Sequence, residues 1–382
     1  MARTHTVFAL VCISIVILAL PLLAQGSTRY HLTGLGYIGY DELERNSTGF
    51  ALNNSGQVAG SSTKTGAMGE FAFRLSSGVM TELPTLSGYD WSWARDINES
   101  GYVVGRSTNS VDGEATLWRP GYAPRDLGAL TGDTSSFASG INNSSKIVGK
   151  SEHWSGGVLT GHAVLWTSLT TIVDLGDLPG GVDSSSAGDI NNSDWVVGAG
   201  FTDAGPEAML WRDGLGMIGL GVLPGFRYSG AHAINDSGVI VGDSGFIDSS
   251  DPYASHAFIW DQVAGMRDLG TLEGGHEFRA YGIDSSSQVV GQYRIASSDQ
   301  RGFVWTSTGG MVDLSGLTDL GGWSYVVAQD INDNGEICGW GINALGDREA
   351  ILLTPYVIPE PGSLLALGSG FLALAGIIRK RR

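Results

Sequence analysis

The segment Ile97-Asn98-Glu99-Ser100-Gly101-Tyr102-Val103-Val104-Gly105 decides the fold of this chain, because its pattern occurs seven times. The copies share the form Ile-Asn-x-Ser-Gly-x-Val-Val-Gly, and their second residues are Asn53, Asn98, Asn142, Asn191, Asn235, Asp284 and Asn332. The intervals between these residues are 45, 44, 49, 44, 49 and 48 positions. A regular period of this size indicates a repeat architecture.

Two further segments follow the copies and complete one structural unit, and only the seventh copy lacks the second of them. A short apolar segment such as Ala115–Trp118 follows, and then a segment of the form Asp-Leu-Gly-x-Leu, as in Asp126–Leu130. Each unit therefore holds four strand candidates, which end at Ile-Asn, at Val-Val-Gly, at Ala-x-x-Trp and at Asp-Leu-Gly. Four short strands in about 46 residues are typical of a propeller blade, so the sequence predicts an all-β, seven-bladed β-propeller of four-stranded blades.

The two ends of the repeat region suggest how the ring closes. Tyr30–Tyr37 resembles the fourth strand of a unit but precedes the first copy, and the seventh unit stops after its third strand at Leu353. We expect the N-terminal strand to complete the last blade, which would leave few exposed strand edges. An open solenoid, the alternative, would need capping repeats.

The N-terminus predicts a secretory signal peptide over residues 1–26. Arg3 precedes an apolar run from Val7 to Leu23, and Ala24-Gln25-Gly26 offers the small residues that signal peptidase prefers. An uncleaved anchor remains the alternative. The propeller would then occupy residues 27–357.

The C-terminal residues 358–382 predict a second hydrophobic helix, a short transmembrane anchor. Pro359-Glu360-Pro361 precedes an apolar stretch from Leu364 to Ile378. The chain ends on a basic stop made of Arg379, Lys380, Arg381 and Arg382. Such a basic end stays on the cytoplasmic side, and the short span suits a transient anchor.

This tail resembles the PEP-CTERM sorting signal, and the repeats resemble the HAF-type extracellular repeat, whose His-Ala-Phe triplet stands here as His256-Ala257-Phe258. The first resemblance implies processing by an exosortase near Pro359 and delivery to the cell surface or extracellular matrix of a Gram-negative bacterium. It also implies a link to exopolysaccharide and biofilm. The second implies an extracellular location without an established chemistry.

The net charge limits the class of partner. The formal net charge of -17 disfavours nucleic acid, because phosphate-rich ligands need clusters of Lys and Arg.

Cys12 lies in the predicted signal peptide, which leaves Cys338 as the one thiol of the mature chain. We interpret Cys338 as a small buried hydrophobic residue, since Val or Ala fills its place in the other repeats.

Tryptophans fall into two groups. Trp118, Trp166, Trp211, Trp260 and Trp305 recur at one strand position, which favours packing between blades. Trp91, Trp93, Trp154 and Trp323 lie outside that position and are candidate ligand-binding residues. Variable loop lengths between the second and third strands place the predicted ligand face on that side of the ring, where the connections between blades also run.

No catalytic or metal-binding motif is assigned. The sequence has no nucleophile elbow, His-Glu-x-x-His motif or cysteine pair. Glu273, His276 and Glu277 are the first acid and imidazole groups to test for catalysis on the ligand face, but a solvated loop is the preferred interpretation. A calcium loop beginning at Asp330 would need a carboxylate where Gly341 stands, so a β-turn is the better interpretation and no cofactor is predicted.

The sequence thus predicts a non-enzymatic, exported surface or matrix protein. Its partners would be signal peptidase and an exosortase during export, and exopolysaccharide or envelope proteins afterwards. The alternative is a secreted polysaccharide-active enzyme, a glycosidase or a lyase, that uses the same face.

Overall fold

The computed structural model describes residues 27–39, 45–64, 66–155, 158–246, 254–296 and 299–358. The predicted signal peptide and sorting tail, with both predicted terminal helices, lie outside these residues. Contacts divide the chain into one unit of Leu32–Thr354 and another of Met1–His31 with Pro355–Arg382. In the described part of the second unit, the rings of His31 and Tyr356 stack at 4.1 Å.

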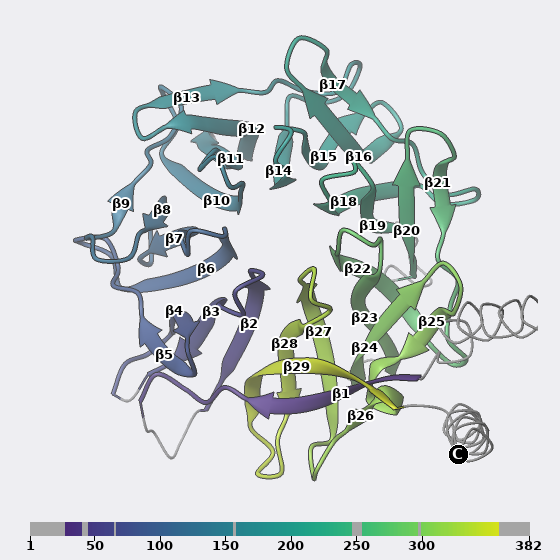
Figure 1. The fold of residues 1–382 in the computed structure, drawn as a ribbon. Coiled ribbons are helices and arrows are strands. Elements are labelled where there is room, and N and C mark those ends of the chain that lie inside the picture. The colour runs from purple at the N-terminus through teal and green to yellow at the C-terminus, as the bar shows by residue number, and fades with distance from the viewer. Residues whose placement is uncertain are drawn as a thin grey trace, which may run out of the picture. The chain divides into compact units, whose positions relative to one another are not determined.

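The unit Leu32–Thr354 is a ring of seven antiparallel sheets, which confirms the predicted all-β, seven-bladed propeller (Figure 1). Six sheets have four strands, and the seventh has five in the order β26 (Thr318–Asp319), β1 (Ser27–Gly34), β29 (Arg348–Ile358), β28 (Ile337–Ile342) and β27 (Tyr325–Ile331). No α-helix occurs among the described residues, which contain one 3₁₀ turn, η1 (Leu314–Leu317). None of the described residues forms a helix long and apolar enough to cross a membrane.

The strands follow the repeats in order. The first repeat contains β2 (Ser47–Leu52), β3 (Val58–Thr63), β4 (Glu70–Ser76) and β5 (Val79–Glu82), and the second β6 (Trp91–Ile97), β7 (Val103–Thr108), β8 (Gly113–Trp118) and β9 (Arg125–Asp126). The third contains β10 (Ser135–Ile141), β11 (Ile147–Ser155), β12 (Val158–Ser168) and β13 (Thr171–Asp174), and the fourth β14 (Ser185–Ile190), β15 (Val196–Thr202), β16 (Gly205–Arg212) and β17 (Gly216–Gly219). The fifth contains β18 (Tyr228–Ile234), β19 (Ile240–Gly245), β20 (Ser255–Asp261) and β21 (Gly265–Asp268), and the sixth β22 (His276–Ile283), β23 (Val289–Ala296), β24 (Asp299–Thr306) and β25 (Gly310–Asp313). The seventh contains β27 (Tyr325–Ile331), β28 (Ile337–Ile342) and β29 (Arg348–Ile358), beside β26 (Thr318–Asp319) and β1 (Ser27–Gly34).

The strand boundaries agree with the sequence pattern except at Val-Val-Gly. The inner strand β6 ends at Ile97, and the third strand β8 ends at Trp118, as expected. The second strand β7 instead begins at Val103, so the Val-Val-Gly segment opens that strand rather than ending it. The reason is the tight turn between Asn98 and Tyr102, which leaves the chain extended again at Val103.

Every inner strand carries one extra residue relative to its partner. In β6, Ala94 pairs with Gly105 and Asp96 with Val104, so Arg95 forms a β-bulge. The bulged residues of the seven inner strands are Phe50, Arg95, Ser139, Gly188, His232, Tyr281 and Gln329. A β-bulge bends its strand and re-aims a side chain, and bulges often adjoin functional sites.

Apolar clusters join neighbouring sheets. Trp118 of the second repeat packs with Ala51 and Ala59 of the first, and Trp166 of the third packs with Val104 of the second. The recurring tryptophans therefore fill the seams between blades, as predicted. Cys338 is fully buried with Leu52 and Val58 of the first repeat, which confirms its interpretation as a packing residue.

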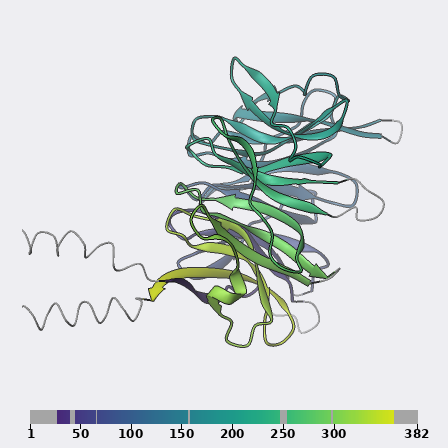
Figure 2. The ribbon, with the colours of Figure 1, turned by 90° about the vertical axis from the view of Figure 1, so that its right-hand side faces the viewer.

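Contacts between the first and last repeats complete the ring of repeats. Asn332 Nδ2 donates to the Asn53 carbonyl oxygen at 3.0 Å, and the Leu52 amide donates to Asp330 Oδ2 at 3.1 Å. Seen from its side, the ring is a stack of sheets packed face to face (Figure 2). The inner strands surround the ring axis, and their ends define the site described next.

Candidate functional site

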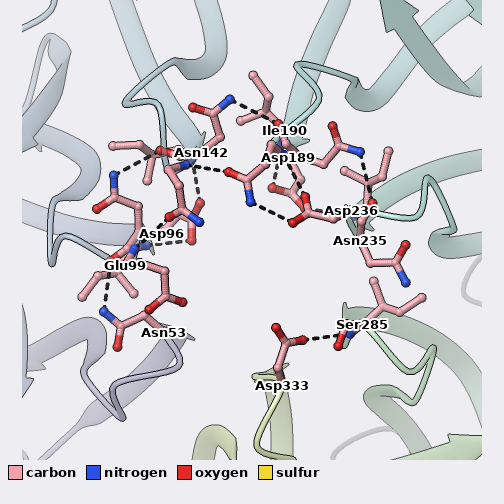
Figure 3. Close-up of a pocket in the computed structure, with 18 of the residues that line it drawn as sticks. Asn53, Asp96, Glu99, Asn142, Asp189, Ile190, Asn235, Asp236, Ser285 and Asp333 are labelled. Atoms are coloured by element: carbon pink, nitrogen blue, oxygen red, sulfur yellow. Dashed lines mark hydrogen bonds between the residues drawn. The ribbon is translucent and has the colours of Figure 1, made fainter.

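The turns that follow the inner strands meet around the axis and are joined to one another by asparagine side chains (Figure 3). Asn98 Oδ1 accepts from the amides of Ser100 and Tyr102 at 3.0 and 3.1 Å, which caps its own turn. Asn98 Nδ2 donates to the Asn142 carbonyl oxygen of the next repeat at 3.1 Å. We call the residues that make both contacts the asparagine ring: Asn53, Asn98, Asn142, Asn191, Asn235 and Asn332.

The asparagine ring is interrupted at Asp284, which occupies the seventh equivalent position. Asp284 accepts from the Gln288 amide at 2.7 Å and so still caps its turn. An ionised carboxylate has no N–H to donate to the next repeat. Burial raises the pKa of Asp284, with the nearby Asp333 carboxylate adding to the shift.

A second circle of hydrogen bonds lies one residue further along each turn. The Glu99 amide donates to Asn143 Oδ1 at 3.0 Å, and the Asn143 amide donates to Asn192 Oδ1 at 2.9 Å. The Ser285 amide donates to Asp333 Oδ1 at 2.9 Å across the seam where Asp284 interrupts the first circle. Side chains at the turns thus serve mainly to hold neighbouring repeats together.

These turns line a cavity of about 200 Å³ on the axis, which we call the outer axial cavity. Its charged lining residues are all acidic: Asp96, Glu99, Asp189, Asp236 and Asp333. No Lys or Arg is among the described residues that line it. Clustered carboxylates around a narrow opening repel anions and attract cations, so phosphate-bearing ligands are disfavoured here.

Below it lies an inner axial cavity of about 140 Å³, lined by residues of the bulges. Phe50, Arg95, Ser139, His232 and Tyr281 contribute to its wall. The Arg95 guanidinium lies 4.9 Å from the ring centre of Phe50 and 5.3 Å from that of Phe137. The bulges therefore bring an aromatic ring, a cation and an imidazole to one axial space.

Three aspartates, Asp96, Asp189 and Asp330, surround the inner axial cavity. Each carboxylate joins two repeats: Asp96 accepts from the Ile97 amide of its own repeat and the Ile141 amide of the next, both at 2.7 Å. Asp189 bonds to Ile190 and Ile234 in the same way, and Asp330 to Ile331 and Leu52. These carboxylates act as bridges at three of the seven seams.

The same aspartates have raised pKa values because protein surrounds them. Burial raises the pKa of Asp96 to about 7, and the Asp189 charge adds to the shift. Burial raises the pKa of Asp189 to about 6 and that of Asp330 well above its ordinary value. The four backbone amides that donate to Asp96 and Asp189 oppose the shift without cancelling it.

A histidine–aspartate pair adjoins the inner axial cavity. His232 Nε2 lies 2.6 Å from Oδ1 of the buried Asp243, and Tyr228 Oη donates to Asp243 Oδ2 at 3.2 Å. The rings of His232 and Tyr281 lie 5.4 Å apart. A carboxylate-oriented imidazole near carboxyl groups of raised pKa has the components of acid–base chemistry.

The predicted ligand-face residues lie at the opposite ends of the inner strands from the asparagine ring. Trp91 begins β6 and donates to the Met68 carbonyl oxygen, while Trp93 donates to Glu70 Oε2 at 2.9 Å. Trp323 is half-buried beside Gly341. The side chain of Trp154 lies outside the described part of the structure.

Glu273, His276 and Glu277 do not form one exposed group. Glu273 is exposed and His276 is half-buried, whereas Glu277 is 2% exposed. Glu277 is ion-paired with Arg279 at 2.8 Å and Arg294 at 2.9 Å, and its φ is +54°. A solvated loop therefore describes Glu273 but not Glu277, because two arginines from β22 and β23 compensate its buried charge.

The sequence did not predict that the axial residues lie together, although it contains one indication of the three aspartates. Asp-Ile-Asn occurs at Asp96, Asp189 and Asp330, whereas Ala or Gly precedes Ile or Leu in the other repeats. The proposed turn at Asp330 is present, with Asn332 Oδ1 accepting from the amides of Asn334 and Glu336 and with Gly335 at φ +74°.

No known protein family and no curated protein matches this sequence. Among solved structures, the chain is similar to the β-propeller domain of the Trilobed protease from Pyrococcus furiosus, with 13% identity and a TM-score of 0.49 over 71% of this chain and 81% of that one. It is also similar to TolB from Acinetobacter baumannii, with 11% identity and a TM-score of 0.46 over 80% and 64% of the two chains. An α-L-arabinofuranosidase from Podospora anserina gives 11% identity and a TM-score of 0.34 over 88% and 98%. We carry no function over from these distant structures.

Proposed function

We propose that this chain is a non-enzymatic, exported protein of the cell surface or extracellular matrix of a Gram-negative bacterium. Its propeller would act as a rigid platform that binds exopolysaccharide or envelope proteins. The observation that carries this proposal is the asparagine ring, which ties successive repeats together through buried hydrogen bonds. Such a ring presents its loops in a fixed arrangement and thereby lowers the entropic cost of binding.

The axial carboxylates support a structural role in preference to a catalytic one. Both oxygens of Asp96, Asp189 and Asp330 accept backbone amides from two repeats. A general acid or nucleophile needs an oxygen free to approach the substrate. We infer that these three side chains hold the seams together.

The proposed location depends on the residue patterns at the two ends. The apolar run Val7–Leu23 supports export, and Pro359-Glu360-Pro361 with the basic Arg379–Arg382 supports processing by an exosortase. If this is correct, replacing Pro359 and Glu360 by Ala leaves the hydrophobic tail attached, which mass spectrometry of the membrane fraction would detect. Normal maturation of that variant would refute the exosortase assignment.

We further propose that β1 closes the ring by completing the seventh blade. Two contacts support this: the Leu35 amide donates to the Ala350 carbonyl oxygen at 2.8 Å, and the Gly36 amide donates to Glu349 Oε1 at 3.0 Å. Strand order in the seventh sheet places β1 next to β29. Pairing this edge would protect β29 from association with other chains.

A polysaccharide-active enzyme is the second candidate, and the pair of His232 and Asp243 favours it. The two functions are separated by a glycan array, followed by product analysis, on the secreted chain. Binding without new reducing or unsaturated ends supports the platform, whereas turnover that is lost in His232→Gln supports the enzyme. If neither binding nor turnover occurs, a purely structural role replaces both.

A further inference from the structure

One histidine and three aspartates lie close together in the third repeat and in the connection that follows it. They lie at the ends of the strands that are far from the asparagine ring. His162 lies in β12, and Asp174 is the last residue of β13. Asp177 and Asp183 lie in the connection from β13 to β14, which enters the fourth repeat. This is the side of the ring on which the second and third strands are joined.

Three of these residues can reach one point. One ligand atom each from His162, Asp177 and Asp183 lie within 4.8 Å of one another, and these are the only His, Cys, Asp or Glu residues so grouped within the described ranges. His162 Nε2 is 3.3 Å from Asp183 Oδ1. Donor atoms this close can contact a common ion at ordinary bond lengths of about 2.0–2.2 Å after small side-chain adjustments.

Asp174 approaches the other nitrogen of the same imidazole. Its Oδ2 lies 3.3 Å from His162 Nδ1. When Nδ1–H donates a hydrogen bond to a carboxylate, Nε2 carries the lone pair, and here Nε2 lies beside Asp183 Oδ1. An imidazole held between an outer carboxylate and a metal is a recurrent arrangement, and it raises the basicity of the ligating nitrogen.

The Asp177 carboxylate supplies a second observation at this site. Its Oδ1 atom is buried, and none of the described residues donates a hydrogen bond to it. A buried acceptor without a donor costs about 1–3 kcal/mol, so native structures usually satisfy such an atom.

We propose that His162, Asp177 and Asp183 bind one divalent transition-metal ion, for which Zn²⁺ is the best match, and that Asp174 positions the imidazole. One nitrogen and two carboxylate donors suit Zn²⁺, whereas Ca²⁺ takes six to eight oxygen ligands. Asp183 is mostly exposed, so a water molecule can complete the coordination from solvent. This proposal is independent of the proposed platform function.

The fifth repeat provides a comparison within the same chain. His256 Nδ1 lies 2.7 Å from Asp268 Oδ2, so the pair equivalent to His162 and Asp174 is present. Thr271 stands where the third repeat has Asp177. A histidine–aspartate pair without the two additional carboxylates should not bind the ion, which makes His256 the matched control.

Isothermal titration of the full chain with ZnCl₂, after removal of metals with EDTA, tests the proposal. We expect one Zn²⁺ per chain, an increase in Tm on addition of Zn²⁺, and a shift of the His162 Nε2 resonance. His162→Gln and Asp177→Asn should each abolish this binding, while His256→Gln should retain it. Asp174→Asn should weaken the affinity about 10-fold to 100-fold, because it alters only the outer partner of the imidazole.

The variants must match the wild-type Tm in EDTA, which separates loss of the site from loss of folding. If His162→Gln unfolds, Asp183→Asn, whose side chain is mostly exposed, serves in its place. The proposal is overturned if the wild-type chain binds no Zn²⁺, or if His162→Gln binds it as tightly as wild type. In the first case the contacts of His162 with Asp174 and Asp183 serve only to hold the loop.

Discussion

At the scale of single residues, each member of the asparagine ring has two tasks. The side-chain oxygen of Asn98 caps its own turn, and the side-chain nitrogen holds the next repeat. Only an amide offers an acceptor and a donor in this geometry. This explains why Asn recurs at six of the seven positions and why Asp284 preserves the turn but not the bridge.

Replacing Asn98 by Ala should lower the free energy of unfolding by about 2–3 kcal/mol, because one buried and two partly buried hydrogen bonds are lost. Urea denaturation measures this change. Asn192→Ala is the control, since Asn192 is exposed and its loss should cost less than about 1 kcal/mol. Equal effects of the two substitutions would show that the buried bridge adds no stability.

The opposite change at Asp284 should stabilise the protein. Asp284→Asn supplies the missing donor and removes a carboxyl group whose pKa is raised by burial. In the folded state this group keeps its proton to a higher pH than in the unfolded chain, so its favourable contribution is lost as the pH rises. The gain should therefore be about 1 kcal/mol at pH 8 and smaller at pH 4, as measured by urea denaturation at both pH values. A gain that is larger at pH 4 would contradict this explanation.

At the scale of the strand, the bulge explains why the third residue of each second strand is glycine. A Cβ added to Gly149 would clash with the Phe137 carbonyl oxygen and approach Ala138 Cα to 2.9 Å. Equivalent clashes with inner-strand carbonyls occur at Gly60, Gly105, Gly198, Gly242, Gly291 and Gly339. The glycine therefore permits the close approach that the bulge requires.

Gly149→Ala should destabilise the fold by about 2–3 kcal/mol, because the strands β10 and β11 must move apart to admit the methyl group. Gly316→Ala is the matched control, since no atom lies within 4 Å of its added Cβ, and its effect should stay within about 0.5 kcal/mol. Thermal and urea unfolding of both variants provide the comparison. A stable Gly149→Ala protein would mean that the bulge adapts without cost.

At the scale of the whole molecule, carboxylates at three seams connect stability to pH. The folded-state pKa values of Asp96, Asp189 and Asp330 are raised above the unfolded value of about 3.9. Their stabilising contribution is complete below that value and is lost as the pH rises through about 6 for Asp189 and about 7 for Asp96. The ring should thus be more stable at pH 5 than at pH 8.

Asp189→Asn tests this connection through the slope of unfolding free energy against pH. The variant should flatten the slope between pH 4 and pH 6 by up to about 1.4 kcal/mol per pH unit, even if its overall stability is lower. Asp261→Asn is the control, because amides and Arg267 lower the pKa of Asp261, so its titration lies below this interval. An unchanged slope in Asp189→Asn would show that Asp189 titrates normally.

Closure by β1 predicts that removal of residues 27–34 weakens the entire ring. The truncated chain should unfold at a lower temperature and associate, because β29 then presents an unpaired edge. Size-exclusion chromatography and thermal unfolding measure both effects, and a peptide of residues 27–37 added in trans should reverse them. A monomeric truncated chain with unchanged Tm would exclude this mode of closure.

Much of the fold could be predicted because its determinants are local. The Asn or Asp that caps each turn, the Trp of five third strands and the repeat period all appear within single units of the sequence. The Val-Val-Gly segment opens each second strand and does not end it as predicted, because the tight turn after Asn98 leaves the chain extended again at Val103. The ion pairs of Glu277 were missed since their partners, Arg279 and Arg294, lie on two different strands.

The seven repeats, the four-stranded blade and the packing role of the recurring tryptophans follow from the residue pattern alone. That Asp96, Asp189 and Asp330 share one axial space, and that His162 lies beside Asp177 and Asp183, follows only from the folded arrangement of the chain. The physical reason is that a turn depends on neighbours within a few residues, whereas these groups meet only when the blades pack around the axis and the connecting loops fold back on their strands.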